Sequence, residues 1–275
     1  MRSTRIVWRI VGITALIATI FFLAGFGYAI RNVLVPASVE ASATPLPTPS
    51  SNPIAAKDGK SINLLAIGDS LTKGIGDTEG KGYVSRVKDT LAQTTKKNVY
   101  LWNYAVSGSK TEDLLDSLDK KDGDLPRFVQ EADVVLFTIG GNDLFQSGVD
   151  VNELFNESGQ LNIDGDLLTL ELPSALERLD RIITRLAELN PRAKIVYVMF
   201  YYPFSDIDVK REGPTFVQEW YNGAFGFANR YPNVIIVPTY DLFSQNPLIY
   251  LFTDHYHPNS AGYARIAERV LQALD

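Results

Sequence analysis

The chain of 275 residues contains no cysteine and only two histidines. Without cysteine it cannot form disulfides, use a thiol nucleophile, bind zinc through thiolates or carry a lipid on an N-terminal cysteine. Basic residues are also scarce: beyond residue 31 the chain has 22 lysines and arginines against 32 acidic residues. Nucleic acid binding needs positive charge to meet the phosphates, so an acidic domain of this kind argues against a nucleic acid partner.

Charge is absent from residues 10–30, which are mostly apolar and have arginines on both sides. A helix of this length, rising about 1.5 Å per residue, covers roughly 30 Å, the thickness of a bilayer's hydrocarbon core. The segment therefore predicts a transmembrane signal anchor, with residues 1–9 in the cytoplasm and the rest of the protein extracytoplasmic. The alternative is a signal peptide cleaved after Ala41-Ser42-Ala43, which would release a secreted protein.

Residues 31–57 are rich in proline, serine and threonine and have little apolar surface to bury. They are predicted to form an extended linker between the membrane and the domain that follows. Residues 58–275 have a length and an apolar content that suit one domain with a substantial core.

In this domain short apolar runs alternate with longer amphipathic stretches, a pattern typical of an α/β fold with a parallel sheet. Residues 145–172 do not fit the alternation and are predicted to be an insertion after the third strand. The predicted strands are 61–67, 98–104, 133–139, 194–200 and 234–238, and the predicted helices are 82–94, 111–119, 173–189, 213–230 and 260–274.

Polar motifs follow several of these strands, and in an open parallel sheet such loops gather at one edge. Ser70, in Gly68-Asp69-Ser70-Leu71, follows the first strand and is a candidate nucleophile that a histidine base would activate. The alternative is that Ser70 caps the helix that follows. Asp69 is expected to orient this loop through hydrogen bonds to the backbone.

Gly108 follows the second strand and Asn142 follows the third, in Gly140-Gly141-Asn142-Asp143. The backbone N–H of Gly108 and the side-chain amide of Asn142 could both donate to an oxyanion. The competing interpretations are a glycine that only supplies unusual backbone angles and an asparagine that caps a helix.

Asp254 and His257 lie just before the last predicted helix. A carboxylate three residues before a histidine can reach back to the ring N–H and fix its orientation, as a catalytic triad requires. A metal site formed by Asp254, His255 and His257 is conceivable, but the chain offers no further histidine. His255 is more simply interpreted as a surface residue or a residue that supports the site from outside.

Taken together and in this order, the motifs resemble those of the SGNH hydrolases, also called the GDSL esterase/lipase family. The resemblance covers residues 61–274 and implies a three-layer α/β/α sandwich of the flavodoxin-like type with a five-stranded parallel sheet. It implies ester hydrolysis without a metal or cofactor, by a triad of Ser70, His257 and Asp254. The implied oxyanion donors are Ser70, Gly108 and Asn142. The G-x-S-x-G of the α/β-hydrolases is missing.

The expected substrate is a small-molecule, lipid or glycan ester, so the leading prediction is an extracytoplasmic esterase or lipase. A thioesterase or a carbohydrate O-deacetylase could use the same triad. A metal-dependent phosphoesterase and a non-catalytic binding module of the cell envelope are the rival classes. Aromatic residues in 199–204, with Leu144 and Phe145, could form a wall for the acyl group. The sequence predicts neither the acyl-chain length nor the oligomeric state.

Overall fold

The computed structural model describes Trp8 and residues 12–19, 21–23, 25–26, 59–120, 122–145, 165–208, 211 and 213–275. The chain divides into two compact units, Met1–Ser50 and Ser51–Asp275. In the first unit residues 12–19 and 21–23 are helical, and no helix within the described residues is long and apolar enough to cross a membrane. Several residues of the predicted 10–30 span, and all of the 31–57 linker, lie outside the described residues.

The second unit is built on a five-stranded sheet in the order β2-β1-β3-β4-β5, with every neighbouring pair parallel. Each strand begins and ends within two residues of its predicted bounds. The interior strands β1 and β3 consist largely of buried apolar residues, as expected for a sheet covered on both faces. The strands are β1 (Ser61–Gly68), β2 (Asn98–Asn103), β3 (Val134–Thr138), β4 (Lys194–Val198) and β5 (Val234–Val237).

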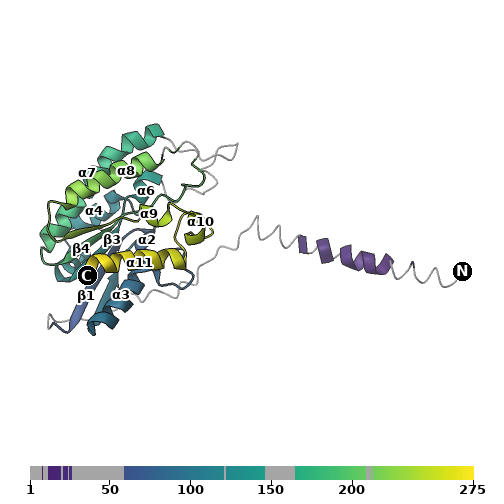
Figure 1. Cartoon of the computed structure of the whole chain (residues 1–275), viewed down its shortest axis with the longest axis horizontal. Helices are drawn as coiled ribbons and strands as arrows, with labels where there is room; N and C mark the ends of the chain where they lie inside the picture. Colours follow the sequence, from purple (N-terminus) through teal and green to yellow (C-terminus); the bar gives the residue numbers. More distant parts are fainter. Residues whose placement is uncertain are drawn as a thin grey trace. The chain divides into compact units, whose positions relative to one another are not determined.

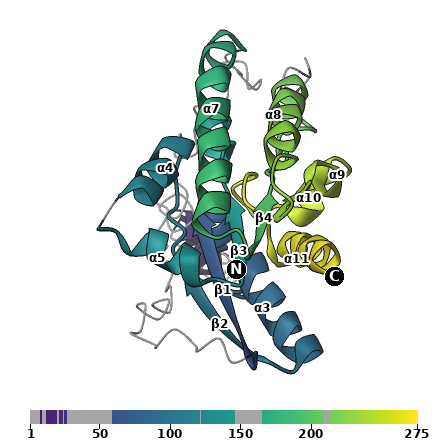
Figure 2. The same ribbon diagram turned by 90° about the vertical axis from the view of Figure 1, so that its left-hand side faces the viewer.

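Helices cover both faces of this sheet, which confirms the predicted three-layer sandwich (Figure 1). One layer holds α3 (Gly82–Thr95) and α11 (Ser260–Leu274), which pack against each other. The opposite layer holds the long α7 beside α8, as both views show (Figure 2). The helices of this second layer are α4 (Thr111–Asp119), α5 (Asp124–Glu131), α7 (Gly165–Leu189) and α8 (Gly213–Ala228).

The prediction of an insertion over residues 145–172 is wrong for the part that the structure describes. Helix α7 begins at Gly165 and not at 173, with Pro173 inside it. Leu168 and Leu172 are buried and extend the apolar stripe of the helix by four-residue steps toward its N-terminus. The sequence pattern favoured a start at Pro173 because proline is common in the first turn and costly inside a helix.

Four single-turn helices lie in the loops that the structure describes, and none of them is among the predicted helices because one turn has no periodicity to detect. Two of these, α2 and α6, begin immediately beyond the carboxyl ends of β1 and β3. After β2 the chain crosses over β1 and forms β3 on its other side, so the strand order reverses between β1 and β3. The loops that contain α2 and α6 meet at this point, which is a usual position for a site in such sheets. The four are α2 (Ser70–Lys73), α6 (Gly141–Phe145), α9 (Tyr240–Phe243) and α10 (Pro247–Tyr250).

Candidate active site

The site begins where β1 ends, at Gly68, which pairs with Thr138 of β3. Gly68 has φ of 117°, and a Cβ at this position would lie 1.8 Å from the carbonyl oxygen of Thr138. Only glycine therefore allows the two strands to end side by side. The next residue, Asp69, continues the contact by donating its N–H to the same carbonyl at 3.2 Å.

Asp69 caps helix α2, because its Oδ1 accepts the N–H of Leu71 at 3.0 Å and the hydroxyl of Thr138 at 2.5 Å. Burial raises the pKa of the Asp69 carboxyl, and the bonds from Thr138 and Leu71 partly offset that rise. The prediction that Asp69 orients the loop is confirmed. The alternative that Ser70 is the helix cap is wrong, since Ser70 is the first residue inside α2.

The loop between α10 and α11 brings His257 to Ser70. An antiparallel bridge between Leu251 and Pro258 closes this loop at its base. The Nε2 of His257 lies 2.8 Å from the Oγ of Ser70, and its Nδ1 lies 2.7 Å from the Oδ2 of Asp254. Residues separated by nearly the whole domain thus form one continuous line of hydrogen bonds, in the order that the sequence predicts.

The charge on Asp254 decides which ring nitrogen of His257 carries the proton. Partial burial would raise the pKa of Asp254, but the His257 ring and the N–H groups of Tyr256 and His257 donate to it and hold the pKa below its ordinary value. An ionised carboxylate can only accept, so Nδ1 is the donor. In neutral His257, Nε2 is then an acceptor that faces the hydroxyl of Ser70.

Asn142 reaches the loop that contains Gly108 from the other side of the site. It is the second residue of α6, and its Nδ2 donates to the carbonyl of Ser109 at 2.7 Å. A side chain that capped the helix would instead accept a backbone N–H through its oxygen. The bond to Ser109 therefore brings the predicted oxyanion donors Gly108 and Asn142 onto two segments in direct contact.

A buried ionic cluster that the sequence analysis missed supports these two segments. The carboxylate of Asp143 accepts the N–H of Thr111 at 3.0 Å and its hydroxyl at 2.5 Å, and it pairs with Arg178 of α7 at 3.3 Å. The cluster ties α6 to the start of α4, just after the Gly108 loop. Its members are 32 and 35 residues from Asp143 along the chain, so no local motif indicates them.

Ser70 and Asn142 line a small hollow that is partly open to solvent. Phe145 and two aromatic residues of the 199–204 stretch line this hollow, whereas Leu144 and the other aromatic residues of that stretch pack in the core. The hollow is lined by Asp69, Ser70, Leu71, Gly141, Asn142, Phe145, Phe200, Tyr201, Pro203 and Tyr256.

The residues considered for a metal site are arranged differently from a ligand cluster. His255 is exposed, as predicted, and both ring nitrogens of His257 are engaged with Asp254 and Ser70. Within the described part of the chain, no three or more His, Asp or Glu residues are grouped so that they could hold a metal ion.

Fold and site together have the arrangement that serine hydrolases use: a hydroxyl, an imidazole and a carboxylate in line beside N–H donors. Comparison with known proteins identifies the particular family. Residues 66–265 match the profile of the GDSL-like Lipase/Acylhydrolase family. The chain belongs to this family, a family of SGNH hydrolases, and is a hydrolase of ester bonds.

Two relatives share much of the sequence. The chain is 36% identical over 222 residues to YpmR of Bacillus subtilis. This match covers 79% of this chain and 83% of the relative. The chain is 27% identical over 225 residues to the spore germination lipase LipC of Bacillus licheniformis. This match covers 77% of this chain and 96% of the relative.

Solved structures of two esterases have the same fold. A lipase from a goat rumen metagenome superposes with a TM-score of 0.64 at 24% identity, over 77% of this chain and 97% of the lipase. An acetylxylan esterase from Geobacillus stearothermophilus superposes with a TM-score of 0.56 at 21% identity, over 78% of this chain and 94% of the esterase.

Proposed function

We propose that the chain cleaves carboxylic esters with Ser70 as nucleophile, His257 as general base and Asp254 as the group that orients the imidazole. The single observation that carries this proposal is the unbroken line of two short hydrogen bonds from Ser70 through His257 to Asp254. A serine hydroxyl is a weak nucleophile unless an adjacent base removes its proton, and Nε2 of His257 is within reach to do so.

The reaction proceeds by two acyl transfers. His257 takes the proton of Ser70 as the oxygen attacks the ester carbonyl, and Asp254 stabilises the resulting imidazolium. His257 then gives this proton to the leaving alcohol, which leaves an ester between the acyl group and Ser70. Water attacks this acyl-enzyme with His257 again as the base, and Ser70 recovers its proton as the acid departs.

The negative charge that develops on the carbonyl oxygen is stabilised by the N–H groups of Ser70 and Gly108 and by the amide of Asn142. An amide NH₂ has two hydrogens, and the bond to Ser109 uses one of them. The second hydrogen is therefore available to an oxyanion in the hollow beside Ser70. Donors fixed in advance in this way need no reorganisation when the charge appears.

Substitution of the reacting groups tests this proposal with p-nitrophenyl acetate as substrate. Ser70→Ala and His257→Ala are each expected to lower kcat by at least about 10⁴-fold, because the members of a triad act as a unit. His255→Asn is the matched control, since it removes the other histidine and asparagine tolerates the φ of 55° at this position. A kcat within about tenfold of the wild type in either triad variant would disprove these roles.

The hollow supports an ester with a small or flat acyl group over one with a bulky acyl group. Little enclosed space remains between its walls, and the rings of Phe145, Phe200 and Tyr201 form much of these walls. A lipid ester, a thioester and an O-acetylated sugar each contain a carbonyl that Ser70 could attack. This range is in keeping with the lipase and the acetylxylan esterase that resemble this chain. A panel of acyl esters, acyl thioesters and acetylated sugars compared by kcat/KM separates them.

We further propose that residues 10–30 anchor the enzyme and that its catalytic domain is extracytoplasmic. The support is the uncharged apolar stretch with Arg2, Arg5 and Arg9 before it. The full chain should remain with membranes after alkaline extraction, and protease outside intact spheroplasts should digest the domain. Release of a mature protein that begins after Ala43 would favour cleavage and secretion.

A further inference from the structure

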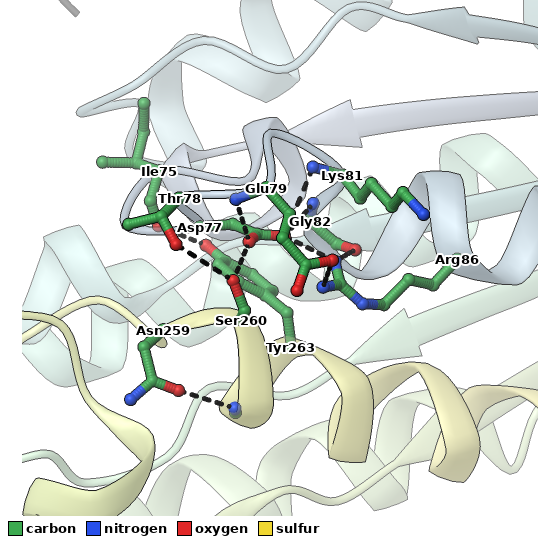
Figure 3. A network of polar contacts seen from close by, with 11 residues as sticks. Ile75, Asp77, Thr78, Glu79, Lys81, Gly82, Arg86, Asn259, Ser260 and Tyr263 are labelled. Carbon is green, nitrogen blue, oxygen red and sulfur yellow. Dashed lines mark hydrogen bonds and ion pairs between the residues drawn. The ribbon is translucent and has the colours of Figure 1, made fainter.

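Asp77, in the loop between α2 and α3, has a fully buried carboxylate that no triad or oxyanion role explains. It accepts the N–H groups of Glu79 at 2.9 Å and Gly82 at 2.8 Å and the guanidinium of Arg86 at 2.5 Å (Figure 3). The loop is thus wound around one carboxylate, whose bonds hold the pKa of Asp77 below its ordinary value despite burial.

Asp77 also bonds across the molecule to helix α11. Its Oδ1 accepts the hydroxyl of Ser260, the first residue of that helix and only three residues beyond His257. Nearby, the hydroxyl of Tyr263 donates to the carbonyl of Ile75 at 2.7 Å. The two contacts fasten the loop to the first turns of α11 (Figure 3).

The same loop packs directly against His257. Gly76 has φ of 91°, and a Cβ there would lie 2.9 Å from the Cβ of His257 and 2.6 Å from the carbonyl oxygen of Pro258. At its other end the loop is bonded to the nucleophile, because Gly74 and Ile75 donate their N–H groups to the carbonyl of Ser70 at 3.0 and 3.1 Å.

The loop therefore connects the backbone of Ser70 to His257 and Pro258, and Asp77 determines its shape. We propose that Asp77 is a positioning residue that holds the imidazole of His257 within bonding distance of the Ser70 hydroxyl by clamping Ser260. Asp77 does not touch the substrate. This inference rests on the proposed role of His257, and misplacement of a reacting group by about 1 Å costs up to about 100-fold in rate.

Ser260→Ala is the sharpest test, because it removes only the hydroxyl that joins Asp77 to α11. The cap of α11 remains, since Asn259 still accepts the N–H of Gly262. With the full chain and p-nitrophenyl acetate, Ser260→Ala and Asp77→Asn should lower kcat about 10- to 100-fold with KM changed less than about threefold. Ser260→Thr retains a hydroxyl and should restore most of the rate.

Asp241→Asn is the matched control. Asp241 of α9 pairs with Arg269 of α11 at 2.8 Å, so it also bonds to α11, but at a residue further from His257 along the chain than Ser260 is. Its kcat should stay within about twofold of the wild type. The positioning role is disproved if kcat per folded molecule is unchanged in Ser260→Ala. It is equally disproved if the whole decrease in rate is explained by a smaller folded fraction.

Histidine-selective ¹⁵N labelling gives a readout that does not depend on turnover, because the chain has only two histidines. The Nδ1–H of His257, held against Asp254, should give a far-downfield proton signal in the wild type that shifts or broadens in Ser260→Ala, while the signals of His255 stay unchanged. An unaltered His257 signal would overturn the inference. If the wild type does not hydrolyse the ester but the His257 signal still changes in Ser260→Ala, only the proposed function is overturned.

Discussion

At the scale of single residues, the site depends on protonation states that neighbouring groups impose. Asp254 receives two backbone N–H groups on one oxygen and the imidazole on the other. These three donors keep it ionised, and an ionised Asp254 fixes the tautomer in which Nε2 of His257 accepts from Ser70. The sequence indicates all three residues, but only the structure reveals the backbone donors that set the charge.

Replacement of the carboxylate by an amide tests this dependence. In Asp254→Asn the amide NH₂ faces Nδ1, which forces the ring proton onto Nε2 and turns the base into a donor toward Ser70. We expect kcat to fall by about 10⁴-fold with little change in fold. The measurement is kcat combined with the ¹⁵N shifts of the imidazole. A rate within tenfold of the wild type, or an unchanged tautomer, would contradict the assignment.

At the scale of elements, the apolar runs predict the five strands well because short apolar runs separated by longer amphipathic stretches form a clear local pattern. The start of α7 is predicted eight residues too late because Pro173 has the local character of a helix start, whereas burial of Leu168 and Leu172 decides the outcome in the folded chain. The clusters around Asp77 and Asp143 could not be predicted, since their partners come together only when the layers pack.

The role of α7 as a support of the core gives a prediction about stability. Leu179 has no exposed surface, so Leu179→Ala leaves a cavity and should lower the free energy of unfolding by about 2–5 kcal/mol. Leu170→Ala on the same helix removes a side chain that is 73% exposed and should change it by less than about 0.5 kcal/mol. Denaturant unfolding measures both, and equal effects would show that burial on α7 does not stabilise the domain.

At the scale of the whole molecule, stability should depend on pH through buried carboxylates. Asp77 and Asp254 have lowered pKa values in the folded protein, so they stabilise it fully above the ordinary aspartate pKa of about 3.9. This contribution is lost as the pH falls from about 5 through their folded pKa values. Asp69, whose pKa is raised by burial, acts with the opposite sign and opposes part of this loss.

We therefore expect the free energy of unfolding to fall on acidification below about pH 5, and to fall less steeply in Asp77→Asn. The variant is less stable near neutrality, but the gap to the wild type should narrow as the pH drops. Denaturant unfolding at a series of pH values measures this. A gap that stays constant from pH 6 to pH 3 would show that the charge of Asp77 does not contribute.

The central claim is that a line of hydrogen bonds between distant segments makes Ser70 the nucleophile of the ester hydrolase. The most direct measurement is peptide mapping by mass spectrometry after treatment of the full chain with a fluorophosphonate. We predict one adduct, on Ser70, which is lost in His257→Ala. Two results would contradict this prediction. One is an adduct on another residue, and the other is a chain that carries no adduct on Ser70 after treatment and still hydrolyses esters at its full rate.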